Sequence, residues 1–191
     1  MSRFLLPAIL IAFLPASAAQ AAIYAGADLV FDSATFTNAA PQLFSEDLTG
    51  PQLHVGYHLS NFAVELGYGT TRKTEQQTDL RFNRLTGDGL FYVPVGGFLN
   101  LVLTAGLAQD NYGASTYTRL PYTQDGIIKE ARVSTTIFNG DEFNWRAGGG
   151  LSFSFAGGYE FHVIARYEPL TMKGLATNDL SLQTGFNIDL N

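Results

Sequence analysis

The stretch QLHVGYHLSNFAVELGYG, residues 52–69, decides the fold class. In residues 52–59 apolar side chains hold the odd positions, and in residues 62–69 Phe, Val, Leu and Tyr hold the even ones. Successive side chains of a β-strand point to opposite faces, so each segment predicts a strand with one apolar and one polar face. Ser60 and Asn61 between the segments predict a tight turn.

The same alternation recurs along the rest of the chain, and no helical periodicity is visible after residue 22. A membrane-spanning strand that is tilted in a barrel needs about 9–11 residues, which is close to the length of each segment. Including the two segments above, the pattern predicts eight strands. The other six are 22–31, 86–93, 98–107, 143–155, 159–168 and 180–190.

The predicted links between strands alternate in length. Short links fall at 60–61, 94–97 and 156–158. Long links fall at about 32–51, 70–84, 108–142 and 169–179. With an even number of strands, this alternation places both ends of the barrel chain and every tight turn on one side. Bacterial outer-membrane barrels have this layout, with short periplasmic turns and long surface loops.

The apolar face of these strands is expected to contact lipid. An eight-stranded barrel has an interior just wide enough for side chains, and small or polar residues fit there more easily than rows of Leu and Phe. Aromatic residues also gather at the predicted strand ends, as in the girdles at the two membrane interfaces. They are Tyr57, Phe62, Phe98, Phe155 and Tyr159 near the tight turns, and Tyr68, Trp145 and Tyr167 toward the other ends.

Composition narrows the class further. The chain has 191 residues, a formal net charge of −6 and no cysteine, so we expect no disulfide framework and no nucleic acid partner. Arg3, the apolar run that follows it and Ala19-Gln20-Ala21 predict a secretory signal peptide over residues 1–21. The barrel domain is then expected over residues 22–191.

The segments YAGADLVF, QLHVGYHLSNFAVELGYG, WRAGGGLSFSF and SLQTGFNIDL resemble the small OmpA/OmpX-type outer-membrane β-barrel family. The resemblance covers about residues 22–191 and rests on pattern and layout. It implies an all-β, 8-stranded antiparallel up-and-down transmembrane barrel in the cell outer membrane. It also implies contact with outer-membrane lipid or lipopolysaccharide and insertion by the barrel-assembly machinery. We expect a monomer without a cofactor.

The letters HLSN at residues 58–61 are similar to the His-x-Ser-Asn motif of the outer-membrane lipid A deacylases. That similarity would make His58 the base and Ser60 the nucleophile. The glutamate that the family places about a dozen residues later is missing, because that region reads TRKT. The turn also falls on the periplasmic side, whereas lipid A lies in the outer leaflet. We therefore interpret HLSN as a turn and expect no catalytic residue and no enzyme.

Neither the histidines nor the glycine run indicates a cofactor site. His54 and His58 lie four residues apart on one strand, about 13 Å from each other, so they cannot bind one metal ion. His162 is on a distant strand. Residues 147–150 read AGGG but continue as a strand, so they do not form a phosphate-binding loop at a helix start.

Charged residues on the polar face are expected to line the interior. Such charges must be paired or hydrated, which predicts a plug of salt bridges; the alternative is a narrow, cation-tolerant pore. Counting from the turns places Arg146, Arg166 and Glu168 in an upper cluster and Asp28, Glu65 and Asp88 in a lower acidic layer. The complete predicted set is Asp28, Glu65, Asp88, Arg146, Glu160, His162, Arg166 and Glu168.

The long link over residues 111–142 is the main candidate for contact with a ligand outside the cell. Tyr112, Tyr117 and Tyr122 are predicted as its binding residues, because tyrosine often anchors protein contacts. Residues 132–138 alternate and could extend the hairpin above the membrane, where an exposed edge could pair with a partner strand. The expected function is a non-enzymatic surface role in envelope integrity, adhesion or host contact. A small-solute channel is the alternative, and a lipid A hydrolase is the least favoured.

Overall fold

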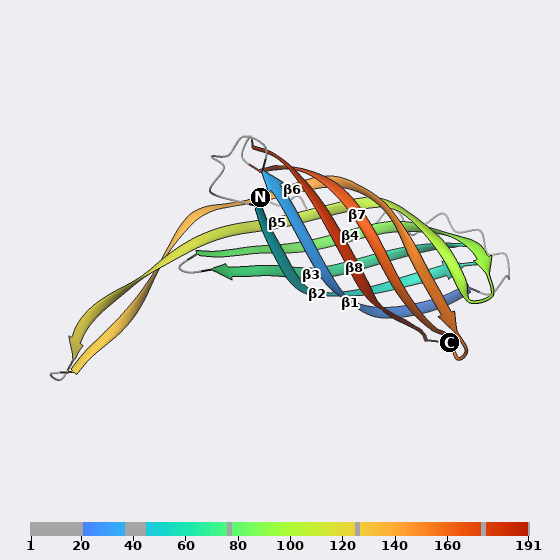
Figure 1. Cartoon of the computed structure of the whole chain (residues 1–191), viewed down its shortest axis with the longest axis horizontal. Helices are drawn as coiled ribbons and strands as arrows, with labels where there is room; N and C mark the ends of the chain where they lie inside the picture. Colours follow the sequence, from blue (N-terminus) through green and yellow to red (C-terminus); the bar gives the residue numbers. More distant parts are fainter. Residues whose placement is uncertain (1–20, 37–44, 76–77, 125–126, 173–174, 191) are drawn as a thin grey trace, which may run out of the picture.

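The computed structural model describes residues 21–36, 45–75, 78–124, 127–172 and 175–190. Nearly all of the predicted signal peptide falls outside these residues. No helix in the described part of the chain is long and apolar enough to cross a membrane. The chain forms a closed barrel in which neighbouring strands are antiparallel and β8 pairs with β1 (Figure 1). The strands are β1 (Ala21–Phe36), β2 (Ser45–Leu59), β3 (Phe62–Glu75), β4 (Thr78–Gly96), β5 (Leu99–Gln124), β6 (Ile127–Phe155), β7 (Tyr159–Met172) and β8 (Leu175–Asp189).

Tight turns lie at one end of the barrel at the three predicted short links, although the second turn is Gly97-Phe98 and residues 94–96 still belong to β4. Ser60, in the first of these turns, has a φ of 53°, a left-handed conformation that suits a turn. The strand pairs Ala22–His58 and Tyr159–Ile188 place the start of β1 and the end of β8 at this same end. The predicted arrangement of eight antiparallel strands with all tight turns on one side is therefore confirmed.

The predicted long loops are wrong in one respect, because most of their described residues are strand. β5 and β6 remain paired as far as Gln124 and Ile127, which lie well inside the predicted link at 108–142. Figure 1 shows the resulting hairpin, drawn in yellow to orange, extending far beyond one end of the barrel. The predicted extension of the hairpin over residues 132–138 is confirmed.

A switch in the alternation explains why the loops were overpredicted. Along β4, Leu85 points outward and is exposed, whereas Leu80 and Phe82 are buried in the interior and Arg81 points outward. Where a strand extends beyond the membrane, its outward face meets water and its inward face meets side chains of the other strands. Its apolar residues therefore occupy the inward face there instead of the outward one. In the sequence this change of phase is easily read as the end of the strand.

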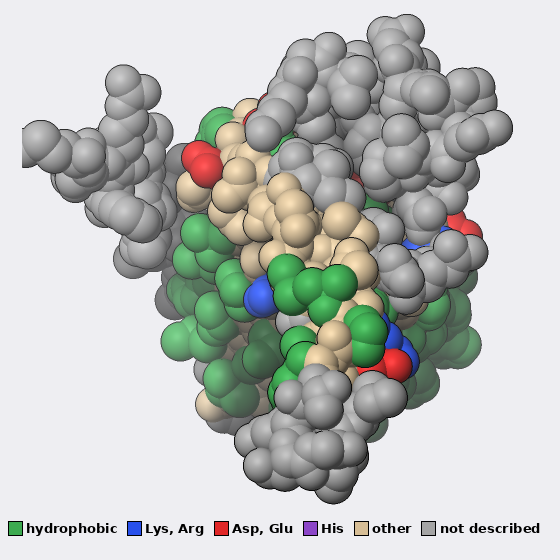
Figure 2. All heavy atoms as spheres, turned by 90° about the vertical axis from the view of Figure 1, so that its left-hand side faces the viewer, with side chains coloured by type: hydrophobic (Ala, Val, Ile, Leu, Met, Phe, Trp, Pro, Cys, Tyr) green, Lys and Arg blue, Asp and Glu red, His purple; other side chains and the backbone are tan. Residues whose placement is uncertain are grey.

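The outer wall of the barrel is apolar, as predicted. Leu53, Leu66, Leu103 and Leu151 are among many large apolar side chains that are exposed on it. Figure 2, seen from the hairpin end, shows hydrophobic side chains along the flanks of the molecule. Aliphatic exposure of this kind suits a wall that faces lipid rather than water.

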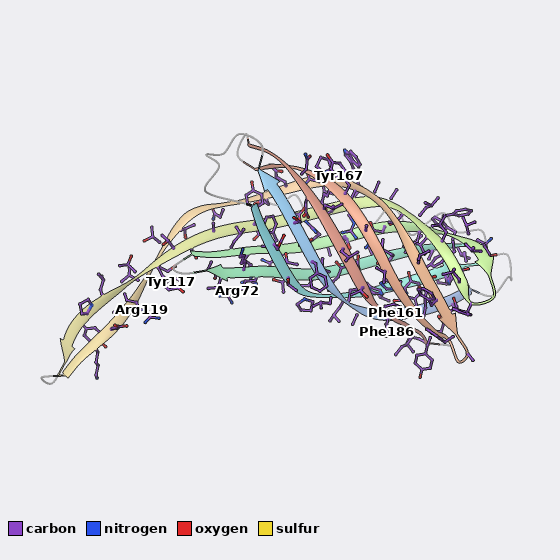
Figure 3. The ribbon with its side chains drawn as sticks, viewed as in Figure 1. Arg72, Tyr117, Arg119, Phe161, Tyr167 and Phe186 are labelled. Carbon is purple, nitrogen blue, oxygen red and sulfur yellow. The ribbon has the colours of Figure 1, made fainter. Side chains whose placement is uncertain are left out.

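Aromatic residues lie on this wall near both strand ends. Near the tight turns, Phe98, Phe153, Phe161 and Phe186 form a row in which neighbouring ring centroids are 5.0 to 6.1 Å apart. Toward the other end, the rings of Trp145 and Tyr167 lie 5.9 Å apart. Figure 3 shows Phe161, Phe186 and Tyr167 on the outside of the barrel. The two groups match the girdles expected at the membrane interfaces.

Candidate functional site

The candidate site is the interior of the barrel, and β4 shows its layers in order. Starting from the tight-turn end, Tyr92, Leu90, Asp88, Arg84 and Phe82 all point inward and are buried. Alternate residues of a strand share a face and are separated by about 6.6 Å along it. The interior therefore passes from apolar through charged and back to apolar along the barrel axis.

Two apolar clusters bound the charged region. The turn-side cluster is made of Tyr24, Ala63, Leu90, Tyr92, Val102 and Ile164. The outer cluster is made of Leu48, Leu80, Phe82, Tyr112 and Ala114. Apart from the tyrosine hydroxyls, these side chains offer no hydrogen bonds to water or ions, so each cluster opposes the passage of a hydrated ion along the axis.

The polar layer next to the turn-side cluster is centred on Asp28 of β1. Its two carboxylate oxygens lie 2.9 Å from His54 Nδ1 and 2.8 Å from His162 Nε2, and Gln183 donates a further hydrogen bond to it. His54 Nε2 is also 2.5 Å from the side-chain oxygen of Asn187. This layer joins β1, β2, β7 and β8 through buried groups.

Glu65 and Glu160 complete the same layer. The Tyr24 hydroxyl donates to Glu65 at 3.2 Å, and His54 Nε2 lies 3.7 Å from the same carboxylate. Glu160 is half-buried and accepts a hydrogen bond of 3.0 Å from Asn187. Both carboxylates therefore belong to one connected network with Asp28.

The next layer pairs Asp88 of β4 with two arginines. Arg146 donates to both Asp88 oxygens, at 2.8 and 2.5 Å, which is the bidentate geometry favoured by guanidinium and carboxylate groups. Arg166 Nη2 lies 3.7 Å from the same carboxylate. All three side chains are buried, so breaking the pairs would leave uncompensated charge inside the barrel.

Arg84 of β4 is the centre of the outermost polar layer. Its guanidinium lies 2.7 Å from Asp110, 2.8 Å from Asp179, 3.2 Å from Asp32 and 3.5 Å from Glu168. These carboxylates come from β5, β8, β1 and β7, so one side chain connects four other strands. Thr71 on β3 donates to Asp32 at 2.7 Å and extends the layer further.

All eight predicted interior charges point inward, but their predicted grouping is wrong. Asp88 does not belong to a lower acidic layer, because it pairs with Arg146 and Arg166. Glu168 does not share a cluster with these arginines but contacts Arg84. Counting from each turn ignored the stagger between neighbouring tilted strands, which shifts the height at which side chains meet.

The Arg84 layer itself was missed by the sequence prediction. Asp32, Arg84, Asp110 and Asp179 had all been placed in long loops. A signal was nevertheless present for Asp32 and Arg84, because each lies four residues from a predicted inward residue on its own strand. These separations are Asp28 to Asp32 on β1 and Arg84 to Asp88 on β4, and alternation would have placed both partners inside.

The HLSN residues form the predicted turn. The His58 ring packs inside the barrel, 4.8 Å from the Tyr92 ring and 6.3 Å from the Tyr24 ring. Ser60 is exposed in the turn that joins β2 to β3. The two side chains thus have different surroundings, which does not favour a base and nucleophile pair.

The three predicted surface tyrosines differ in exposure. Tyr112 is 3% exposed and packs in the outer cluster, with its ring 6.1 Å from the Phe82 ring, so its predicted place on the surface is wrong. Strand alternation turns it inward at a height where the interior is apolar. Tyr117 is half-exposed and Tyr122 is exposed, both on the protruding hairpin (Figure 3 labels Tyr117). A ligand-binding role for these two residues stays a prediction.

A closed barrel with an apolar wall, aromatic girdles and a charged interior defines the class of integral outer-membrane β-barrel proteins. The chain belongs to the family of the outer membrane protein beta-barrel domain, whose model matches residues 4–190. No curated protein matches the chain.

Several solved structures share the fold. Neisserial surface protein A (NspA) is 14% identical, with a TM-score of 0.66 over 90% of this chain and 99% of that one. A major outer membrane protein from Thermus thermophilus is 12% identical, with a TM-score of 0.57 over 89% and 99%. The outer membrane protein AlkL is 10% identical, with a TM-score of 0.50 over 94% of each chain. At these identities the likeness shows the fold alone.

Proposed function

We propose that the protein is a non-conducting, non-enzymatic barrel of the outer membrane that presents the β5–β6 hairpin outside the cell as a contact surface. The observation that carries this proposal is the length of the hairpin. Among the described residues, β4 pairs with β5 as far as Thr116, whereas β5 and β6 stay paired for eight more residues on β5, to Gln124. Because long connections of such barrels lie on the cell surface, the hairpin is placed there.

The chemistry of the hairpin supports a role in contact. Leu120, Tyr122 and Val133 expose large apolar surface on it, although this part lies beyond the lipid-facing wall. Arg119 and Glu130 form an exposed ion pair at 3.4 Å. A mixture of aromatic, aliphatic and arginine side chains is typical of surfaces that bind a partner. In the described part of the chain, β5 beyond Thr116 also has an edge without a β4 partner, to which an extended segment could add.

The packed interior supports the non-conducting part of the proposal. Three charged layers and two apolar clusters lie across the axis of a barrel whose diameter leaves room for little else. Such cross-strand ion pairs make the barrel rigid, which suits a base for a protruding hairpin.

Shortening the hairpin tests the contact role. Thr116 and Thr135 are register partners, so an Asn-Gly turn can replace residues 117–134 without changing the barrel. We expect the shortened protein to fold with the same heat-dependent shift on gels. Cells that display it should attach to host cells or extracellular matrix no better than cells that lack the protein, in a count of bound cells.

A full-length hairpin with Leu120, Tyr122 and Val133 changed to threonine is the matched control for length. It should also lose attachment, because the strands remain while the exposed apolar side chains are gone. Attachment by the shortened protein equal to that of the wild type would disprove the contact role of the hairpin.

A further inference from the structure

The outward face of β3 and β4 changes from apolar to basic at the height where the membrane should end. Tyr68 and Leu85 are exposed register partners, and Arg72 and Arg81 are register partners four residues further on. Arg72 lies ten residues beyond Phe62, which sits at the tight-turn end of β3. At about 3.3 Å per residue and a tilt near 40°, this separation is about 25 Å along the membrane normal.

That height equals the usual height of the apolar band of an outer-membrane barrel, about 25 Å. The two arginines therefore lie level with the headgroups of the outer leaflet. Figure 3 shows Arg72 at the end of the barrel from which the hairpin extends. Charged groups at this level meet lipid phosphates rather than acyl chains.

The two arginines differ in how their charge is balanced. Arg72 makes a bidentate pair with Asp79, at 2.7 and 2.8 Å, and Thr74 also donates to Asp79 at 2.9 Å. Arg81 donates its Nε hydrogen to the side-chain oxygen of Asn83 at 3.0 Å. Among the described residues no carboxylate forms an ion pair with Arg81. Its charge is thus available to an anion from outside the protein.

Arg81 also borders a hollow on the outer wall. The hollow has a volume of about 340 Å³, in the range of small-ligand sites. It lies over β4, β5 and β6, where a shift of register between Ala114 and Ser115 interrupts the β5–β6 ladder. Its lining combines the Arg81 guanidinium with carboxamide and hydroxyl groups, which can bind phosphate and sugar hydroxyls. It also includes the carboxylate of Asp79, which accepts both hydrogen bonds from Arg72. Lining residues include Asp79, Arg81, Asn83, Asn111, Thr136 and Asn139.

We propose that this hollow binds the phosphorylated sugar headgroup of a glycolipid in the outer leaflet, with Arg81 holding a phosphate. The surface on the tight-turn side of the hollow carries exposed Leu85, Leu107 and Phe143, on the same three strands. A ligand with a polar headgroup and acyl chains matches both the polar hollow and the apolar surface beside it. A free sugar phosphate matches only the polar hollow. The site lies on the barrel wall and does not depend on the contact role of the hairpin.

The test compares Arg81→Gln with Arg119→Gln, which removes the same charge from an exposed site on the hairpin. The full barrel is refolded into phosphatidylcholine nanodiscs that contain a small fraction of labelled bisphosphorylated lipid A. The lipid that stays with the protein after exchange against empty nanodiscs is then measured. The wild type and Arg119→Gln should retain it equally, and Arg81→Gln should retain about five to ten times less.

Two further arms decide the ligand chemistry. The same glycolipid without phosphates should be retained by the wild type as weakly as the phosphorylated form is by Arg81→Gln. A soluble glucosamine phosphate should not compete at concentrations equal to the glycolipid. Each of three results would overturn the proposal. The first is an equal loss of bound lipid in Arg81→Gln and Arg119→Gln. The others are equal retention of the phosphorylated and dephosphorylated lipids by the wild type, and full competition by the soluble sugar. A normal heat-dependent gel shift confirms that each variant is folded.

Discussion

Replacing Arg84 by leucine is expected to lower the free energy of unfolding of the barrel by about 3–5 kcal/mol. The guanidinium lies within 3.5 Å of four carboxylates on four other strands, and all of these groups are buried. Leucine fills part of the volume but leaves the carboxylates to repel one another in a medium that solvates them poorly. Equilibrium unfolding by urea in lipid vesicles measures the change.

Arg119→Leu is the matched control, because it breaks an ion pair whose side chains are 69% and 60% exposed. Exposed pairs contribute about 1 kcal/mol or less, so this variant should unfold close to the wild type. A deficit no larger than that of Arg119→Leu would show that the Arg84 layer does not hold the strands together.

Replacing Gly150 by alanine is the second substitution with a large expected effect, about 3 kcal/mol, at the upper end of what overpacking usually costs. A β-carbon built there would collide with the backbone carbonyl oxygen of Val163 and approach the Cα of Ile164 to 2.6 Å. These atoms belong to the backbone of β7, so no side chain can rotate away. We expect less folded protein in refolding reactions, measured from the heat-dependent gel shift.

Gly87→Ala separates this effect from the general consequences of replacing glycine in a strand. Its new β-carbon would meet only a Leu66 methyl group at 3.6 Å, an ordinary contact. Both substitutions reduce the freedom of the unfolded chain in the same way. Gly87→Ala should therefore fold as well as the wild type, and equal folding yields for both variants would show that β6 and β7 are not packed this closely.

The membrane-spanning parts of the fold could be predicted from sequence, because contact with lipid requires apolar side chains at most outward positions and so produces a regular alternation. Between the two aromatic girdles, the outward residues are mostly apolar and the charged ones point inward, so alternation alone gives the facing of Glu65, Arg146 and Arg166, although the turn-side cluster is also inside. The turn at Ser60-Asn61 could also be predicted, because these two residues separate two segments of regular alternation. The resemblance to small outer-membrane barrels rested on these regions and is confirmed by the family match.

Beyond the girdles the prediction failed because the solvent changes. Leu80, Phe82 and Tyr112 point inward there, whereas Leu85 and Leu107, nearer the membrane centre on the same strands, point outward. Tyr112 was consequently placed in a surface loop, and Arg84 and Asp110 were not assigned to the interior. Contacts between distant strands, such as Arg146 with Asp88, depend on strand stagger, which one sequence does not reveal.

From these layers we expect the barrel to be closed by its own side chains. The interior holds more carboxylates than arginines around Arg84, and such a surplus could favour cations if a water path existed. The turn-side and outer clusters lie on either side of the charged layers and oppose such a path. Function is therefore expected at the surface, at the hairpin and at the hollow beside Arg81.

Conductance of the refolded barrel in a planar lipid bilayer tests most directly whether the interior is closed. We expect no current steps above those of the protein-free bilayer, because the charged layers and both apolar clusters block the axis. Arg84→Leu should stay silent too, as long as the outer cluster remains packed. Steady, cation-selective openings of the wild type that weaken in Asp88→Asn or Glu65→Gln would contradict a closed interior and make the protein a channel.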